Sequence, residues 1–217
     1  MQPRDLKVFI GYDPRQPVAY SVLQHSIASR ASEPVSIIRL QLSQLPMTRV
    51  GLTEFTYSRF LVPYLCKYQG TALFLDADML VLDDITKLFD LADGSAVQVV
   101  KNAQKFEWPS LMLFNCERCK LLTPYAVQNM PTGEAFGFRW APEIGDLPAE
   151  WNHCVSYDDP GPAKLVHYTQ GIPVWPETKD CEYSEEWHNE RKAMMGTVTW
   201  KELMGNSIHA AHMKAAE

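Results

Sequence analysis

The segment LFLDADMLVL, residues 73–82, places two acidic side chains inside an apolar run. Burial of an unpaired carboxylate is costly, and this segment contains no basic residue. Asp76 and Asp78 lie two positions apart, so in an extended segment their side chains point to the same side. Two converging carboxylates supply the oxygen ligands that Mg²⁺ and Mn²⁺ prefer. The pair therefore predicts a divalent metal site, although carboxylates at this spacing also cap turns.

A third ligand for this site is predicted in the segment LVHYT, which contains His167. An imidazole beside two carboxylates shifts the preference towards Mn²⁺. The alternative is that His167 is a core histidine whose ring nitrogens are satisfied by neighbouring groups. The cofactor prediction is therefore Mn²⁺, with Mg²⁺ as the second choice.

The elements that must position these residues alternate between strands and helices. Short β-rich or apolar runs predict strands over residues 6–10, 35–42, 71–78, 95–101, 110–115 and 163–169. Helical patterns occur over residues 17–31, 53–68, 83–92, 117–128 and 184–195. This alternation is typical of an α/β fold, with a mostly parallel mixed sheet flanked by helices in a Rossmann-like arrangement. Ligands of such sheets bind beyond the carboxyl ends of strands, where Asp13, Asp76, Asp78 and His167 are predicted to lie.

Composition and charge bear on whether the protein binds nucleic acid and on its cellular compartment. The 217 residues are 46% hydrophobic and 21% charged, and the formal net charge is −6. An acidic chain without a clustered basic face is not expected to bind nucleic acid. We see no secretory signal and no apolar run of transmembrane length, so we expect a cytoplasmic protein, with peripheral membrane contact left open. No linker or repeat interrupts the chain, which predicts a single domain over residues 1–217.

The five cysteines are few and odd in number, which fits a reducing compartment. Cys116 and Cys119 form a CxxC pair, and a zinc site would recruit His153 and Cys154 as its other ligands. A single CxxC lacks a second pair at the required spacing. We therefore favour the structural interpretation, in which both cysteines are buried.

Three blocks of the sequence agree in order with one enzyme family. They are TYSRFLVPYLCKYQGTALFLDADMLVLDDITKLFD (residues 56–90), PSLMLFNCE (109–117) and LPAEWNH with KLVHYTQGIPVW (within 147–175). Together they resemble the GT-A-type nucleotide-sugar glycosyltransferases, particularly those similar to glycosyltransferase family eight. The resemblance covers most of residues 6–175.

The resemblance implies an activity as well as a fold. It implies transfer of a sugar from a nucleotide-sugar donor, with a UDP-sugar favoured, to an unknown glycan, lipid or protein acceptor. The reaction would depend on a metal and retain the anomeric configuration. It also implies a nucleotide-binding half over about residues 1–100 and an acceptor-binding, metal-closing half over about 101–217.

The resemblance also implies roles for particular residues. Asp76, Asp78 and His167 would bind the metal, and Arg59 would reach the donor and act with the two aspartates in catalysis. The donor side would further include Gly11, Tyr12, Asp13, Ala77 and Gly171. The acceptor or sugar side would include Asn115 and Asn152. Apart from the resemblance, four tryptophans cluster in the irregular part of the sequence: Trp108, Trp140, Trp151 and Trp175. They could offer a platform for a sugar ring, with Trp108 and Trp151 as the candidates. Each has a structural alternative. Arg59 would pair with Glu54 or with a motif aspartate, Asn115 would end a strand, Tyr12 and Asp13 would form a turn before Pro14, and the tryptophans would lie in the core.

Two departures from the family pattern concern the phosphates and the reacting sugar. Family members commonly follow the histidine with a Gly and a Lys that grip the diphosphate, whereas Gln170 and Pro173 stand at those spacings and Gly171 is displaced by one. The charge would then come from Lys101, Lys164 or Arg15. The Asp-Gln pair that the family often uses beside the sugar is also missing, and Glu134 and Arg139 are the nearest polar candidates.

Two other functions compete with transfer. A haloacid-dehalogenase-like phosphatase also has an Asp-x-Asp motif after an apolar strand, and EIGDLPAE faintly resembles its later acidic cluster. Met79 and Leu80 stand where that motif normally carries a small residue or Thr, and the motif lies late in the chain. A non-catalytic nucleotide-sugar-binding domain is the other alternative, suggested by the two departures.

Overall fold

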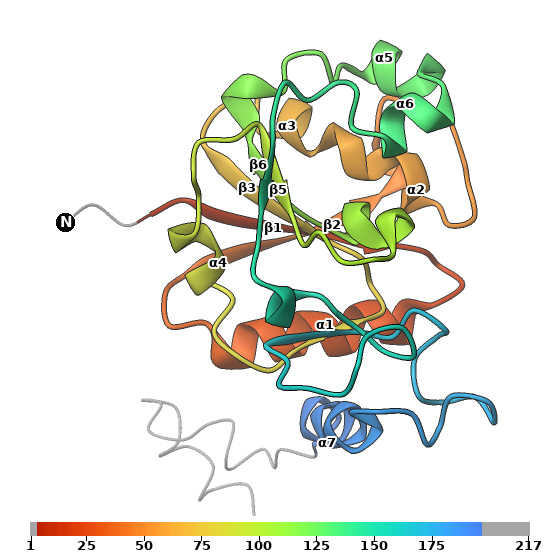
Figure 1. Cartoon of the computed structure of the whole chain (residues 1–217). Helices are drawn as coiled ribbons and strands as arrows, with labels where there is room; N and C mark the ends of the chain where they lie inside the picture. The colour runs from red at the N-terminus through yellow and green to blue at the C-terminus, as the bar shows by residue number, and fades with distance from the viewer. Residues whose placement is uncertain (1–3, 197–217) are drawn as a thin grey trace, which may run out of the picture.

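The computed structural model describes residues 4–196 and has a central sheet with helices on both faces (Figure 1). The six strands of this sheet lie in the order β2-β1-β3-β6-β5-β7. Their bounds are Leu6–Tyr12 (β1), Val35–Gln41 (β2), Thr71–Leu75 (β3), Val97–Val99 (β5), Leu111–Asn115 (β6) and Ile144–Asp146 (β7). Neighbouring strands are parallel except beside β6, which runs antiparallel to β3 and β5. The predicted α/β fold with a mostly parallel mixed sheet is confirmed.

The centre of the sheet is apolar on both faces because helices cover both. Helix α1 (Pro17–Arg30) begins at a proline, whose fixed φ suits the first helical turn, and buries one side of its surface against the sheet. Helices α2 (Phe55–Ser58) and α3 (Val62–Leu65) lie on the opposite face (Figure 1). The other helices are α4 (Lys87–Asp90), α5 (Pro124–Asn129), α6 (Thr132–Phe136) and α7 (Ser184–Met194). Single 3-10 turns occur at Leu42–Gln44, Arg59–Leu61, Cys116–Arg118 and Ala149–Trp151.

A second, three-stranded sheet begins directly after Asp78. Its strands are β4 (Met79–Val81), β9 (Leu165–His167) and β8 (His153–Cys154), in the order β4-β9-β8. The predicted strand over residues 71–78 is therefore divided, because β3 ends at Leu75 and the chain turns before β4. This turn carries the two motif aspartates between the two sheets.

Three predicted helices are shorter than the sequence pattern indicated. Residues 53–68 form α2, the turn Arg59–Leu61 and α3, with Pro63 in the first turn of α3 where a missing N–H is tolerated. Residues 117–128 contain only α5, which begins at Pro124 and is capped by the Thr123 hydroxyl. Residues 83–92 contain only α4, because Asp84 Oδ1 accepts the N–H of Thr86 at 3.0 Å and holds a turn ahead of it.

The cysteines are all unpaired, and four of them are buried. Cys116 and Cys119 lie at the end of β6, whereas His153 and Cys154 form β8 in the other sheet. His153 Nε2 lies 2.9 Å from Glu182 Oε2. Within residues 4–196, no helix has both the length and the apolar character needed to cross a bilayer.

Candidate active site

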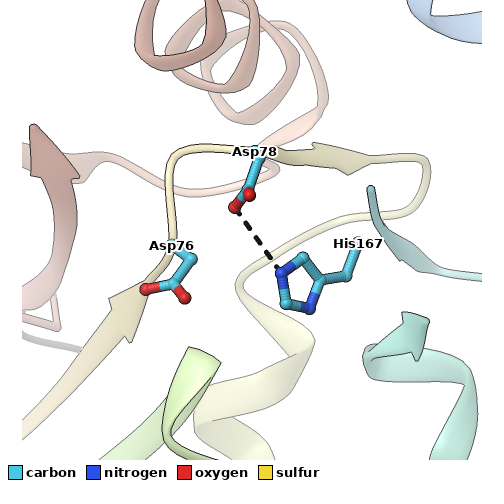
Figure 2. A group of neighbouring side chains, drawn as sticks. All are labelled: Asp76, Asp78 and His167. Carbon is cyan, nitrogen blue, oxygen red and sulfur yellow. Dashed lines mark ion pairs between the residues drawn. The ribbon is translucent and has the colours of Figure 1, made fainter. Parts of the chain in front are cut away.

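The turn between β3 and β4 holds Asp76 and Asp78 by its backbone. The Asp76 N–H donates to the carbonyl of Ser110 at 2.9 Å, and the Asp78 carbonyl accepts from Tyr168 N–H at 2.9 Å. Met79 pairs with His167 across β4 and β9, which sets the histidine beside the turn. Figure 2 shows the two carboxylates and the imidazole of His167 pointing towards a common space. The structure therefore brings the three predicted ligands together.

These three side chains form a group that could hold a metal ion. One ligand atom from each lies within 4.8 Å of the others, and no other such group of His, Cys, Asp and Glu occurs within residues 4–196. His167 Nε2 lies 3.5 Å from Asp78 Oδ1. The Oδ1 atoms of Asp76 and Asp78 are buried without a hydrogen-bond donor. Orphaned buried carboxylate oxygens are costly, so this donor set fits a divalent cation such as Mn²⁺ or Mg²⁺.

Arg59 is buried against the first motif aspartate. Its Nη1 donates to Asp76 Oδ2 at 3.2 Å and to the Pro109 carbonyl at 2.9 Å, and its Nη2 lies 3.0 Å from Asp76 Oδ1 in an ion pair without hydrogen-bond geometry. The guanidinium also lies over the ring of Phe74. The predicted alternative contact with a motif aspartate is confirmed. A direct contact of Arg59 with the donor stays a prediction.

The two aspartates have different electrostatics. Burial raises the pKa of Asp76 to about 7, because the charge of Arg59 only partly offsets the loss of water and Asp78 adds to the rise. Burial also acts to raise the pKa of Asp78, but its contacts with His167 outweigh this and the net pKa is lowered. Burial acts to lower the pKa of His167, but Asp78, Cys154 and Glu107 together hold it well above 6.5. In the metal-free protein, Asp78 and His167 therefore form an ion pair. Ionisation of Asp76 is the less favourable of the two, because its pKa is raised whereas that of Asp78 is lowered.

Asp76→Asn should stabilise the metal-free protein at high pH. The folded-state pKa of Asp76 lies above its ordinary value of 3.8, so its favourable contribution is present in acid and is lost as pH rises towards 7. This loss amounts to at most about 4 kcal/mol of the free energy of unfolding. Denaturant unfolding in EDTA at several pH values should show a flatter pH profile for the variant and greater stability above pH 7. A variant less stable than wild type throughout would contradict the assignment.

Asp13→Asn provides a matched control of opposite sign. The Arg15 guanidinium, assisted by two backbone N–H groups, lowers the pKa of Asp13 to about 2 despite burial. A lowered pKa contributes stability above the ordinary value and loses it as pH falls through the folded value. Asp13→Asn should therefore lower the free energy of unfolding at neutral pH in the same measurement.

The predicted donor-side residues of β1 reach the same edge of the sheet. Ile10 pairs with Leu75 in parallel register, so the chain after Ile10 lies beside the chain after Leu75. At Gly11 an added Cβ would lie 2.5 Å from the ring of Phe55, which explains the glycine by packing. Tyr12 has the guanidinium of Arg39 4.8 Å from its ring centroid, and Arg15 clamps the buried Asp13 at 2.6 and 2.9 Å. These residues therefore lie at the same edge of the sheet as the motif, and their role on the donor side stays a prediction.

Two of the residues predicted on the acceptor side are placed elsewhere. Asn115 pairs with Thr71 at the start of β3, whereas Leu111 pairs with Leu75 beside the motif. Because β6 is antiparallel, Asn115 lies at the opposite edge of the sheet, and its predicted place beside the sugar is wrong. Trp151 is 1% exposed and belongs to the core, so it cannot stack on an acceptor ring.

Asn152 and Trp108 lie close to the motif but are engaged within the protein. Asn152 is fully buried, and its Nδ2 donates to Ser110 Oγ at 3.0 Å. Trp108 is half-buried, and its indole N–H donates to the Asn102 carbonyl at 3.0 Å. A contact of either residue with the acceptor stays a prediction.

Two of the three basic residues suggested as diphosphate ligands already form ion pairs within the protein. Arg15 pairs with Asp13, and Lys164 Nζ lies 3.1 Å from Glu150 Oε1 and above the ring of Trp151. Lys101 is exposed. The phosphate grip stays a prediction.

The loop after β9 is shaped around a glycine. Gln170 donates to the Tyr157 hydroxyl at 2.8 Å, and Gly171 has a φ of 108°, which favours glycine. Both residues line a hollow of about 240 Å³.

Glu134 and Arg139 lie on and just after α6 and share a backbone hydrogen bond. A role for either pair in transfer stays a prediction.

The sequence interpretation missed Glu107, which lies beside the metal ligands. It belongs to the 3-10 helix η3 (Lys105–Ser110), which precedes β6. Its Oε2 lies 3.8 Å from His167 Nδ1, and burial raises its pKa, opposed by His167 and assisted by Asp78. It lies there because β6 is antiparallel to β3, which places the start of β6 next to the motif, and no signal in the sequence gives this direction.

Comparison with known proteins identifies the family. The family model "Glycosyl transferase family 8" matches residues 15–123. A curated relative, "Protein CDI" of Arabidopsis thaliana, is 36% identical over 227 residues, spanning 87% of each chain. The chain belongs to glycosyl transferase family 8. It is a glycosyltransferase, which confirms the predicted resemblance and excludes the phosphatase alternative.

Solved structures show the same fold. The bifunctional glycosyltransferase WbbM superposes with a TM-score of 0.65 at 15% identity, covering 100% of this chain and 53% of WbbM, so this chain spans about half of that protein. The galactosyltransferase LgtC, solved with donor and acceptor sugar analogs, gives a TM-score of 0.59 at 13% identity over 90% of this chain and 98% of LgtC. GlyE from Streptococcus pneumoniae gives 0.60 at 15% identity over 88% and 60%. The predicted GT-A type is confirmed.

Proposed function

We propose that this family 8 enzyme transfers a sugar from a UDP-sugar to an acceptor and uses a divalent cation, Mn²⁺ in preference to Mg²⁺. The observation that carries this proposal is the convergence of Asp76, Asp78 and His167, with two buried carboxylate oxygens left without donors. A bound cation would act as a Lewis acid on the departing diphosphate, an effect worth several kcal/mol. LgtC was solved with both donor and acceptor sugar analogs, which supports a two-substrate reaction here.

The residues around the cation site would orient the donor. Arg59 holds Asp76 with its carboxylate facing the common space, so that the ligand is positioned before the donor arrives. Asp13 is kept ionised by Arg15 at the end of β1, where a carboxylate suits the hydroxyls of a ribose. We propose that about residues 1–100 bind the nucleotide and that about residues 101–217 bind the acceptor and complete the metal site, since His167 comes from this later part. By family analogy we propose retention of configuration.

We further propose a cytoplasmic location. The five unpaired cysteines support a reducing compartment. The acceptor would be a glycan, lipid or protein, and peripheral membrane contact would bring a lipid acceptor within reach.

Binding of UDP should depend on the cation. Because the ligand carboxylates repel a diphosphate unless a cation lies between them, we expect calorimetry to give at least about tenfold tighter UDP binding with Mn²⁺ than in EDTA. ADP serves as the base control and should bind more weakly. Equal affinity for UDP in Mn²⁺ and EDTA would contradict the proposal. A mass-spectrometric scan of nucleotide sugars with Mn²⁺ would then identify the donor.

A further inference from the structure

The two ring nitrogens of His167 face different acidic groups. Nε2 lies 3.5 Å from Asp78 Oδ1, on the side of the common space. Nδ1 lies 3.8 Å from Glu107 Oε2 and 3.9 Å from the Cys154 sulfur. A histidine that binds a metal through one nitrogen usually donates the other N–H to a carboxylate or carbonyl, which fixes the tautomer and the ring orientation. Around His167 a carboxylate lies at ion-pair distance from Nδ1, and the Cys154 sulfur lies within hydrogen-bonding distance of the same nitrogen.

Glu107 is held in place by its own segment. Its side chain is 14% exposed. Its N–H donates to the Gln104 carbonyl at 2.8 Å, and its carbonyl accepts the Ser110 hydroxyl at 2.5 Å. Ser110 Oγ in turn accepts from buried Asn152. The backbone of Glu107 is therefore fixed next to His167, and only the side chain has to adjust for its carboxylate to reach Nδ1.

Cys154 is the weaker candidate for the Nδ1 partner. Its sulfur already accepts from Asn102 Nδ2 at 3.2 Å, and the thiol lies 3.5 Å from the Asn152 carbonyl, to which it donates. Thiols are weak acceptors, whereas hydrogen bonds to an ionised carboxylate are among the strongest in proteins. The carboxylate of Glu107 is therefore the preferred acceptor.

We propose that Glu107 is a positioning residue that accepts the Nδ1 proton of His167 and so presents Nε2 to the cation held with Asp76 and Asp78. The 3.8 Å separation is that of an ion pair, and closure by about 1 Å gives a hydrogen bond. Glu107 is not one of the three residues whose ligand atoms converge, so it acts through the histidine. This role rests on the proposed metal-dependent function.

A double-mutant cycle on Mn²⁺ affinity tests the role. Calorimetric titration of Mn²⁺ in the presence of UDP is carried out on wild type, Glu107→Gln, His167→Ala and the double variant. Glu107→Gln should weaken Mn²⁺ binding about tenfold, as removal of such partners commonly does. In the His167→Ala background the same change should have no further effect, because the residue through which Glu107 acts is gone.

A second Glu–His pair provides the control. Glu182 Oε2 lies 2.9 Å from His153 Nε2, outside the metal group, so Glu182→Gln should leave Mn²⁺ affinity unchanged. Nitrogen NMR of the His167 ring in the metal-free protein adds a readout independent of the metal. Glu107→Gln should shift the Nδ1 resonance, whereas Glu182→Gln should not.

Three outcomes would overturn the proposal. Equal weakening by Glu107→Gln with and without His167 would show that Glu107 acts through its charge or as a ligand itself. Unchanged affinity and an unchanged Nδ1 resonance in Glu107→Gln would remove any role. Failure of wild type to bind Mn²⁺ would overturn the metal centre and this role with it. Normal binding of Mn²⁺ by wild type with no effect of Glu107→Gln would overturn the positioning role alone.

Discussion

Asp78→Asn should reduce sugar transfer at least about a thousandfold, which corresponds to about 4 kcal/mol of lost transition-state stabilisation. The amide keeps the volume of the carboxylate but turns donor hydrogens or a neutral oxygen towards a place that needs a charged ligand. Oδ1 of Asp78 is buried and accepts no hydrogen bond, and it lies 3.5 Å from its ion-pair partner His167 Nε2, so in the metal-bound protein it is free to bind the cation. Initial rates at saturating donor and Mn²⁺ measure the effect.

Asp83→Asn is the matched control for this substitution. Asp83 lies five residues further along the chain and pairs with Lys87 in an i,i+4 salt bridge, away from the metal group. Its removal should leave the rate within about twofold of wild type, since pairs of this kind contribute little. Near-normal transfer by Asp78→Asn at saturating Mn²⁺ would show that Asp78 is not a ligand.

Asp78→Asn should also lower the stability of the metal-free protein, although an unpaired buried carboxylate would suggest a rise. His167 outweighs the effect of burial and lowers the pKa of Asp78, so the folded state gains from its ionisation. The strained carboxylate of the pair is Asp76, whose pKa is about 7. The melting temperature in EDTA should therefore fall for Asp78→Asn and rise for Asp76→Asn, although the sequence pattern gives no reason to distinguish the two aspartates.

The metal group could be predicted from the sequence because each ligand adjoins a strand. Parallel strands bring their carboxyl ends to one edge, and this rule correctly places Asp13 near Asp76 through the pairing of β1 and β3. His167 reaches the same place for another reason. It lies on β9, which pairs antiparallel with β4 directly after the motif. A strand of three residues such as β4 has no periodic signal of its own, so this second sheet was not predicted.

The direction of β6 is what the sequence does not contain. An apolar run of five residues has the same pattern read either way, and pairing partners decide its direction. A parallel β6 would have placed Asn115 at the site, whereas the antiparallel strand places Pro109, Ser110 and Glu107 there instead. The omission of Glu107 follows from this unknown direction, whereas the role predicted for Asn115 rests on the family resemblance. Trp151 was misplaced for a different reason, since composition cannot distinguish a core tryptophan from a surface one.

His167→Ala should weaken Mn²⁺ binding by about 10- to 100-fold at pH 8 while leaving the fold intact. The imidazole binds a metal only when Nε2 is unprotonated. In the metal-free protein the pKa of His167 is held well above 6.5, so the proton competes with Mn²⁺ at a higher pH than for an ordinary histidine. Calorimetry of Mn²⁺ binding in the presence of UDP, from pH 6 to pH 9, measures both effects. His153→Ala, which removes a buried histidine outside the metal group, should leave the affinity unchanged.

The pH dependence of Mn²⁺ affinity should count the protons that leave the site. Metal binding requires ionised Asp76, whose pKa is about 7, as well as neutral His167, so the wild-type affinity should fall as pH drops through both values. Below both pKa values the slope of log affinity against pH should approach about two protons in wild type. In His167→Ala the proton of His167 no longer contributes, so the slope near neutral pH should be smaller, although Asp78 then lacks the partner that lowers its pKa and takes up a proton of its own in acid. An unchanged slope together with unchanged affinity in the variant would show that His167 is a core residue. Weaker binding at pH 8 together with a reduced slope near neutral pH would identify His167 as the nitrogen ligand, because Nε2 must lose its proton before it can bind the metal.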